Sequence, residues 1–373
     1  MLEDIPTPAL LLDRPRFDRN ADRLKQRLSG LGVGLRPHMK TAKSADILRV
    51  LAPEAITVST LKEAESFAEA GARDILYAVG LAPAKLSRVK ALRARGVDLS
   101  VVVDNEAAAR AIAAAPVADG RPIPVLIEID TDGHRAGVQP RDEAALLEIG
   151  RILSSGGATL RGVMTHAGGS YGAAGEASHA AAAEDERAGA VAAAETLRRA
   201  GLPCPVVSVG STPTAHAARS LAGVTEVRAG VYMFGDLVMA GLGVLAVEDI
   251  ALSVLATVIG HQRDKGWIIV DAGWMALSRD RGTGSHEVDQ GYGLVCSADG
   301  VPFPDLIVVD ANQEHGIIAL RPGSPAGLPT LLVGDQVRIL PIHACATAAQ
   351  HDRYQVLGTT GAVEAVWPRF SGW

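Results

Sequence analysis

The sequence has few cysteines, no long apolar run and no excess of positive charge. Its three cysteines, Cys204, Cys296 and Cys345, are odd in number and widely spaced, which fits a reducing compartment better than a disulfide framework. No apolar run of roughly 18 residues is present, and residues 1–8 carry acidic side chains, so neither a membrane span nor a signal peptide is predicted. The formal net charge of −6 provides no basic surface for nucleic acid. We therefore expect a cytoplasmic protein that binds neither membranes nor nucleic acid.

What is present predicts an α/β fold. The chain has 373 residues, more than one core usually holds, and short β-branched runs alternate with longer amphipathic stretches over residues 15–235. The runs are Val33–Leu35, Ile56–Ser59, Ile75–Val79, Leu99–Val103, Val125–Ile129, Leu160–Thr165, Val206–Val209 and Thr225–Val227. Eight such runs favour a closed (β/α)₈ TIM-type barrel. The rival, a doubly wound sheet, would place a glycine-rich loop after the first strand, and Arg36–Lys40 stands there instead.

The character of the sequence changes after Gly241. Short β-rich runs separated by Gly, Pro, Asp and Asn indicate a mainly antiparallel β domain. These runs are Ile250–Gly260, Gly266–Asp271, Leu306–Val309, Gly316–Leu320, Gln336–Leu340 and Tyr354–Leu357. We expect a barrel over residues 10–240 and a β domain over residues 241–373, joined by residues 1–9. Within the barrel, the alanine-rich segment Ala173–Arg199 is expected to form a long, mostly exposed helix.

The stretch Leu35–Ser44 carries the first chemical signal. It leaves a predicted strand and enters a helical pattern, which places Lys40 at the carboxyl-terminal mouth of the barrel, where active sites of this fold form. A partly desolvated lysine there is a nucleophile that forms a Schiff base with an aldehyde. The alternative is an ordinary surface lysine.

Two glycine loops follow the last two predicted strands, where barrels often bind phosphate. The first contains Gly210, Ser211 and Thr212, and the second contains Gly230 and Tyr232. Each loop alone is also an ordinary turn or helix cap. Together with Lys40 they predict a phosphorylated aldehyde cofactor.

Other candidates stand at neighbouring strand ends. Arg135 follows the fifth strand, where it either binds the phenolate oxygen of such a cofactor or pairs with local aspartates. His166 follows the sixth strand, where it either stacks on the cofactor ring or packs structurally, and Tyr171 lies close behind it. The sequence Gln313-Glu314-His315 joins two strands of the β domain and serves either turn chemistry or a substrate site.

The sharpest signal of the β domain is His343-Ala344-Cys345. On a strand, residues two apart face the same side, so His343 and Cys345 are predicted to bind one metal ion there. Imidazole with thiolate favours Zn²⁺, with positions open for water or substrate. A chance His-x-Cys with a buried structural cysteine is the alternative.

With these motifs together, the chain resembles the fold-type III pyridoxal-phosphate enzymes, within them the D-serine dehydratase and D-threonine aldolase family, which is related to alanine racemase. The resemblance covers the whole chain. The matching segments are Thr7–Leu10, Arg36–Lys43, Gly133–Gly137, Gly210–Thr212, Gly230–Tyr232, Glu314–Gly316, His343–Cys345 and Trp367–Trp373. It implies that Lys40 is the Schiff-base lysine and that His343 and Cys345 hold the metal. The candidate substrate residues are Tyr171, Gln313, Glu314 and His315.

The resemblance implies a lyase that uses pyridoxal 5'-phosphate and a divalent metal (Zn²⁺ favoured, Mn²⁺ or Mg²⁺ as alternatives) to dehydrate and deaminate D-β-hydroxy amino acids. The alternative is retro-aldol cleavage of the D-threonine aldolase type, and an amino-acid racemase or a non-catalytic cofactor carrier fits less well. A homodimer with sites at the interface is also implied. Two departures from the family pattern, Thr165 where a tyrosine is usual and Ser59 where a glutamine is expected, leave the substrate open.

Overall fold

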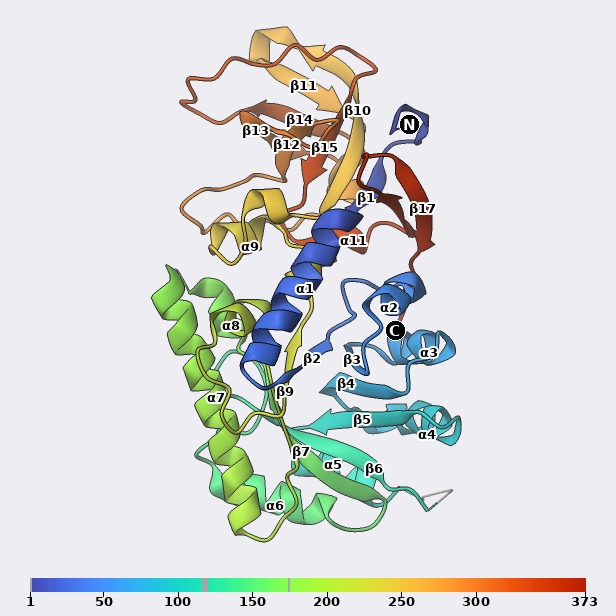
Figure 1. Ribbon diagram of the computed structural model, residues 1–373, viewed down its shortest axis with the longest axis vertical. Helices are drawn as coiled ribbons and strands as arrows, with labels where there is room; N and C mark the ends of the chain where they lie inside the picture. The colour runs from blue at the N-terminus through green and yellow to red at the C-terminus, as the bar shows by residue number, and fades with distance from the viewer. Residues whose placement is uncertain (1, 116–119, 174) are drawn as a thin grey trace. The chain divides into compact units, whose positions relative to one another are not determined.

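The computed structural model describes residues 2–115, 120–173 and 175–373 (Figure 1). The chain divides into two compact units. One, called here the barrel unit, comprises residues 23–230 and 371–373, and the other, called the β unit, comprises residues 1–22 and 231–370. The sequence places the division after residue 240, ten residues later than the barrel unit ends.

The barrel unit confirms the predicted (β/α)₈ architecture. Its eight parallel strands follow the order β2-β9-β8-β7-β6-β5-β4-β3. Their bounds are β2 Gly34–Pro37, β3 Ala55–Val58, β4 Asp74–Gly80, β5 Asp98–Val103, β6 Ile123–Ile129, β7 Ala158–Thr165, β8 Val206–Val209 and β9 Glu226–Ala229. The ends of this order meet at a parallel bridge between His38 and Thr57, and the Met39 N–H donates to the Thr57 carbonyl at 2.8 Å. This bridge closes the barrel.

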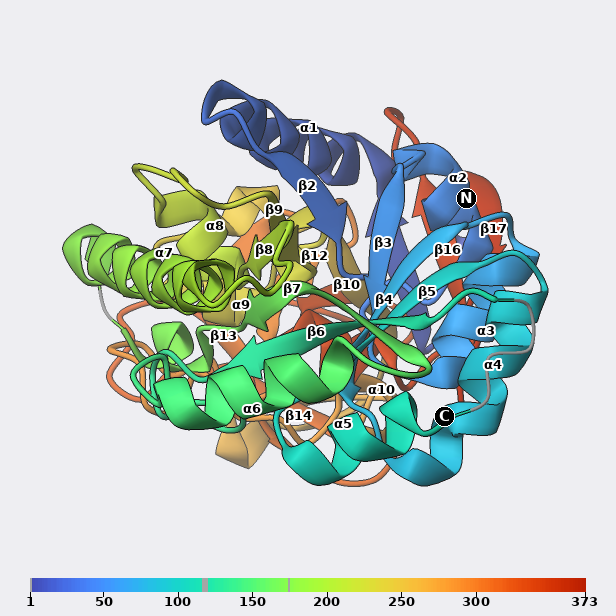
Figure 2. The ribbon, with the colours of Figure 1, turned by 90° about the horizontal axis from the view of Figure 1, so that it is seen from below.

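Helices cover the outside of the strands (Figure 2). Their bounds are α2 Ala45–Leu51, α3 Leu61–Glu69, α4 Leu86–Ala94, α5 Glu106–Ala113, α6 Glu143–Leu153, α7 Gly175–Arg199 and α8 Thr212–Ala217. Several begin at side-chain caps that the sequence displays: Thr60, Asn105 and Asp142 accept the N–H of a residue three positions on, which satisfies a free donor of the first turn. Strands such as β6 are buried along their whole length, as in parallel sheets covered on both faces.

Helix α7 is more buried than the mostly exposed helix that the sequence predicts. It buries a face that contains His179, Ala183, Glu186, Ala190 and Leu197, among others. The helix contacts β7 and β8, so its small alanines form the packing face rather than a solvated one. The burial of Glu186 brings a carboxylate under the loops that follow these two strands.

The β unit confirms the predicted mainly antiparallel domain. Its nine strands follow the order β11-β14-β13-β12-β15-β10-β1-β16-β17, and β10 also pairs with β11, so six strands form a ring. Their bounds are β1 Ala9–Asp13, β10 Leu252–Gln262, β11 Trp267–Val270, β12 Leu294–Ser297, β13 Pro302–Ala311, β14 Gly316–Leu320, β15 Gln336–Leu340, β16 Arg353–Leu357 and β17 Val363–Pro368. The strands β12 and β17 are absent from the predicted runs. Strand β1 joins this sheet, antiparallel to β10 and parallel to β16.

Helix α1 (Arg14–Gly30) follows β1 directly, and its residues 14–22 belong to the β unit and its residues 23–30 to the barrel unit. The short helices α9 (Leu237–Gly241), α10 (Trp274–Leu277) and α11 (Ala344–Ala348) belong to the β unit. Over the described residues, no helix combines the length and the apolar character that crossing a membrane requires.

Candidate active site

The two lysines of the segment after β2 have different surroundings. The Lys43 ammonium lies 3.4 Å from the carboxylate of Glu63, which is fully buried and also accepts the Ser59 N–H at 2.8 Å. Lys40 is exposed, and among the residues that the structure describes no ion pair involves it. The expected partial desolvation of Lys40 is therefore not observed. Of the two amines, Lys40 alone is uncommitted, which agrees with its predicted role as the reacting lysine.

Two histidines near Lys40 are held in their neutral form. Burial lowers the pKa of His166, the hydrogen bond to Gly210 raises it and the charges of Lys40 and Arg228 lower it, with a net result of about 4. Burial likewise lowers the pKa of His38 well below its ordinary value, with Lys40 the next cause. The Nδ1 atom of His166 lies 3.0 Å from the Gly210 carbonyl, so in the neutral ring Nδ1 carries the proton and Nε2 is the acceptor.

The loop after β8 has the shape of an anion cradle. Gly210 adopts φ +140°, and a β-carbon there would lie 2.0 Å from the Arg228 carbonyl, so only glycine fits. Ser211 caps α8, and its hydroxyl is occupied by Thr214 at 3.0 Å and Ser170 at 2.8 Å. The buried hydroxyl of Thr212 has no hydrogen-bond partner among the residues that the structure describes. Of the two hydroxyls predicted for phosphate, Thr212 is thus the unsatisfied one, and buried polar groups without partners mark sites that a ligand completes.

A carboxylate that sequence reasoning missed supports this loop from below. Oε1 of Glu186 accepts the N–H of Ala167 at 3.0 Å and the N–H of Gly210 at 2.9 Å. Burial raises the pKa of Glu186, while the hydrogen bonds from Thr214, Gly210 and Ala167 oppose the rise. One side chain of α7 thereby fixes the loops after β7 and β8 relative to each other. The periodic Glu residues of this helix gave no signal of that role.

Gly230, predicted in the second phosphate loop, lies against the segment after β2. A β-carbon at this position would lie 3.1 Å from the His38 carbonyl oxygen, so the close approach of the ends of β9 and β2 favours glycine. The end of β9 therefore borders the segment that carries Lys40.

Arg135 lies on the loop after β6, as predicted. Its side chain is 58% exposed, and its guanidinium lies 3.3 Å from the carboxylate of Glu128. Burial raises the pKa of Glu128, and the charge of Arg135 lowers it. The loop is tied to its neighbour because the Asp132 carboxylate accepts the Gly169 N–H at 2.7 Å. The pair with Glu128 uses only part of the guanidinium, which leaves donors for a ligand.

The other barrel candidates cluster after β7. The rings of Tyr171 and His166 are tilted, with centroids 6.4 Å apart. Thr165, the departure at the preceding position, bonds through its hydroxyl to that of Thr131 at 3.1 Å, and its carbonyl accepts from the buried Arg228. Ser59, the other departure, donates its hydroxyl to Glu63 at 2.9 Å. The structure thus brings Lys40, His166, Tyr171 and the Gly210–Thr212 loop to the carboxyl-terminal ends of the barrel strands.

In the β unit, the prediction that His343 and Cys345 lie on a strand is wrong. Strand β15 ends at Leu340, His343 is the N-cap of α11, and Cys345 lies in its first turn. The alanine-rich sequence after His343 favours a helix, and the buried Asp236 accepts the Ala344 N–H at 2.9 Å at its start. The two predicted ligands are nevertheless brought together, since their side chains are hydrogen-bonded to each other.

Asp280, which the sequence analysis missed, orients the histidine. Its carboxylate lies 2.7 Å from His343 Nδ1. Histidines that bind a metal through one ring nitrogen usually hydrogen-bond a carboxylate or carbonyl through the other, so this contact leaves Nε2 for the metal. Burial lowers the pKa of His343, but the hydrogen bonds to Asp280 and Cys345 outweigh it and raise the pKa to about 11. Within the described ranges, no group of three or more His, Cys, Asp or Glu side chains forms a metal cage. His343 and Cys345 therefore form a two-residue donor set, which suits a metal that keeps open positions.

The remaining candidates also belong to the β unit. Gln313, Glu314 and His315 form the exposed tip between β13 and β14, and the Gln313 carbonyl accepts the Met275 N–H of α10 at 3.1 Å. Helix α10 is in turn joined to α11, because the Thr347 hydroxyl donates to the Leu277 carbonyl at 2.8 Å. Tyr232 is buried in the β unit, and burial raises its pKa.

Comparison with known families agrees with this geometry. The model described as "Alanine racemase, N-terminal domain" matches residues 12–238, and the model described as "Putative serine dehydratase domain" matches residues 251–357. The chain belongs to this family of fold-type III pyridoxal-phosphate-dependent lyases. The chain is an enzyme, and its relatives carry the names of dehydratases and aldolases.

Members of the family align over nearly the whole chain. D-threo-3-hydroxyaspartate dehydratase of Delftia sp. (strain HT23) is 56% identical, over 99% of this chain and 98% of that protein, and its solved structure superimposes with a TM-score of 0.96, covering 100% and 99% of the two chains. D-serine dehydratase of Schizosaccharomyces pombe is 31% identical over 100% and 93% of the two chains. The structure of D-threonine aldolase from Filomicrobium marinum is 27% identical, with a TM-score of 0.81 and coverage of 98% and 95%.

Two further solved structures are of substituted forms of D-threo-3-hydroxyaspartate dehydratase. One is a cysteine-to-alanine mutant in the metal-free form, and the other carries an alanine in place of a histidine two positions earlier. The spacing of the substituted residues is that of His343 and Cys345. A metal-free form implies that a metal is bound in this family.

Proposed function

We propose that this enzyme dehydrates D-β-hydroxy amino acids to keto acids and ammonia, with D-threo-3-hydroxyaspartate as the first substrate to test. The observation that carries the proposal is the pairing of an oriented imidazole, His343 held by Asp280 at 2.7 Å, with the Cys345 thiol on the same helix start. The 56% identity to a dehydratase for that substrate supports the choice of reaction.

Residues of the barrel unit fit pyridoxal phosphate. The unpartnered hydroxyl of Thr212 and the glycine cradle at Gly210 suit its phosphate, and Lys40 is the free amine that would hold its aldehyde. When bound, the cofactor withdraws electrons from the α-carbon of an amino acid and makes its proton acidic. Lys40 is the base that removes this proton from the α-carbon. The acceptor Nε2 of His166 orients the bound molecule without adding a charge, because the ring is neutral.

Residues of the β unit fit a divalent metal, with Zn²⁺ favoured by the imidazole and thiolate donors and Mn²⁺ or Mg²⁺ as alternatives. The metal supplies Lewis acidity for a departing hydroxide. Asp280 fixes the ring of His343 so that Nε2 remains the donor, and Asp236 holds the start of α11. Gln313, Glu314 and His315, whose side chains are exposed at the hairpin tip, are proposed to contact substrate, as is Tyr171.

Retro-aldol cleavage is the second candidate, favoured by the likeness to D-threonine aldolase. Product analysis separates the two reactions. The purified enzyme is loaded with pyridoxal phosphate and Zn²⁺ or Mn²⁺ and supplied with D-threo-3-hydroxyaspartate. Loss of the α-proton and the hydroxyl gives oxaloacetate and ammonia, which supports the proposal. Cleavage between the α- and β-carbons gives glycine and glyoxylate, which replaces dehydration by aldol cleavage.

Two variants control this experiment. Lys40→Ala is expected to abolish turnover and the absorbance of the cofactor–lysine linkage, whereas Lys43→Ala is expected to retain both. If Lys40→Ala kept the absorbance, the assignment of the reacting lysine would be wrong. The homodimer and the cytoplasmic location stay predictions, and sedimentation equilibrium and cell fractionation test them.

A further inference from the structure

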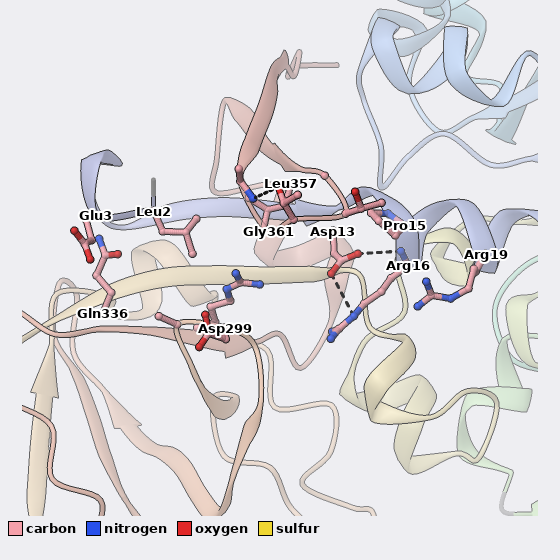
Figure 3. A pocket seen from close by; sticks show the side chains of 16 residues that line it. Leu2, Glu3, Asp13, Pro15, Arg16, Arg19, Asp299, Gln336, Leu357 and Gly361 are labelled. Carbon is pink, nitrogen blue, oxygen red and sulfur yellow. Dashed lines mark hydrogen bonds and ion pairs between the residues drawn. The ribbon is translucent and has the colours of Figure 1, made fainter.

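A pocket of about 610 Å³ lies in the β unit, outside the residues discussed above (Figure 3). The start of α1, strand β15 and the turn between β16 and β17 form its walls. Its charged lining residues are Glu3, Asp13, Arg16, Arg19, Asp299 and Arg338. Pockets of this size take small organic molecules.

The unusual member of this lining is Arg338. It lies in the middle of β15, between Leu255 of β10 and Cys296 of β12, and it is 7% exposed. Its Nε is buried without a hydrogen-bond partner, and no ion pair or hydrogen bond joins its guanidinium to any part of the chain that the structure describes. Arginine is rarely buried without a partner, because removing its charge from water is costly unless an opposite charge replaces the water.

In the described chain, no acid of the pocket forms an ion pair with Arg338, and the charges of Asp13 and Asp299 act on it only from beyond contact distance. Asp13 is committed to Arg16, since its carboxylate accepts the Arg16 N–H at 2.9 Å and lies 3.3 Å from Arg16 Nε (Figure 3). Asp299 and Glu3 are exposed, and neither lies within ion-pair distance of Arg338 in the described chain.

A second cation, Arg19, lies on the wall that α1 forms. Arg19 stands three residues after Arg16 on α1, so both side chains project from one face of the helix, as Figure 3 shows. Arg19 is exposed and, among the described residues, forms no ion pair. A small turn residue makes room opposite, because a β-carbon on Gly300 would lie 3.2 Å from Arg338 Nη1.

We propose that this pocket binds a small anionic metabolite, of the carboxylate or phosphate class, through the guanidinium groups of Arg338 and Arg19. Planar guanidinium groups match both kinds of oxyanion with paired hydrogen bonds. The bound anion supplies the opposite charge that Arg338 lacks and so stabilises the β unit. The site does not depend on the lyase reaction proposed above.

Binding is tested on the full-length enzyme saturated with pyridoxal phosphate, so that the cofactor site cannot take up the probe. Inorganic phosphate and malonate are titrated separately by calorimetry at constant ionic strength, and thermal unfolding is followed in parallel. One saturable site per chain is expected for at least one probe, and the probe that saturates identifies the class of anion. The absence of saturable binding of either probe would overturn the proposal.

Three variants locate the site. Arg338→Met, which keeps the apolar stem, is expected to weaken binding at least about tenfold. Without probe, this variant should unfold at a temperature no lower than that of the wild type. It should not gain the thermal stability that the probe gives the wild type. Arg19→Gln, whose exposed position leaves the fold intact, is expected to weaken binding several-fold and provides the test if Arg338→Met fails to fold. The control is Arg353→Gln, a 57% exposed arginine of the same unit, which is expected to bind as the wild type does. Equal affinity in the wild type and both pocket variants would refute the assignment.

Discussion

The Nδ1 atom of His343 lies 2.7 Å from the carboxylate of Asp280, a residue 63 positions earlier in the chain. Because this contact fixes the ring with Nε2 as the free donor, Asp280→Asn is expected to lower metal affinity by about 10–100-fold. Competition of the enzyme with a chelating dye for Zn²⁺ measures the change. Asp310→Asn, which alters an exposed carboxylate on β13, is the control and should leave the affinity unchanged. Unchanged affinity in Asp280→Asn would show that the contact does not orient a metal ligand.

The contact of Glu186 with the loops after β7 and β8 gives a second prediction. Glu186→Ala leaves the N–H groups of Ala167 and Gly210 without an acceptor, at a cost of about 1–3 kcal/mol for each buried donor. We expect weaker pyridoxal-phosphate binding, by roughly tenfold or more, as measured by absorbance titration. Glu186→Gln should bind nearly as the wild type does, because both N–H groups donate to one oxygen, Oε1, which an amide also supplies.

The exposed Glu184, which pairs with Arg187, provides the control variant Glu184→Gln. If Gln and Ala at position 186 weakened binding equally, the charge of Glu186 would matter rather than its position as an acceptor, and the geometric account would fail.

Arg36 joins strands across the seam where the barrel closes. From β2, its guanidinium lies 2.8 Å from Glu226 on β9 and 2.8 Å from Asp74 on β4. Arg36→Leu leaves both carboxylates without this partner, so we expect a loss of about 3–5 kcal/mol in the free energy of unfolding. Urea denaturation measures it. Arg49→Leu, which removes a 64% exposed arginine paired with Asp46, should change stability by less than about 1 kcal/mol. Equal effects of the two substitutions would contradict the role of Arg36 at the seam.

The fold followed from local patterns because each barrel strand and its helix are continuous in the chain. The run Val125–Ile129 signals β6 without any distant residue. Strand β17 alternates between half-buried and exposed positions, so it lacks the apolar run by which the other strands were found.

The site was partly predictable for the same reason. The segment around Lys40 and the pair His343 and Cys345 are local motifs. Asp280, which contacts His343, and Glu186, which contacts Gly210, come from distant segments, and only the folded chain shows these contacts. The helical conformation of Cys345 was missed because the short alanine-rich segment after β15 could either continue the strand or begin a helix. The hydrogen bond from the Ala344 N–H to Asp236 stabilises the start of the helix.

Acid sensitivity of the barrel unit is a final prediction. His216 lies on α8, and burial, followed by the positive charges of Arg23 and Arg27, lowers its pKa to about 4. In the unfolded chain the pKa is about 6.5, so between these values the unfolded state binds more protons than the folded one. Stability is therefore complete above about pH 6.5 and falls as the pH drops toward 4. At pH 5 the cost for this group is about 2 kcal/mol.

His216→Gln removes the titrating group, so the variant should lose about 2 kcal/mol less than the wild type between pH 7.5 and pH 5. The free energy of unfolding in urea at each pH measures the difference. His315→Gln, at an exposed position of the β unit, should behave as the wild type. If His216→Gln lost as much stability as the wild type, the acid sensitivity would have to come from the other buried histidines, His38 and His166, whose pKa values burial also lowers.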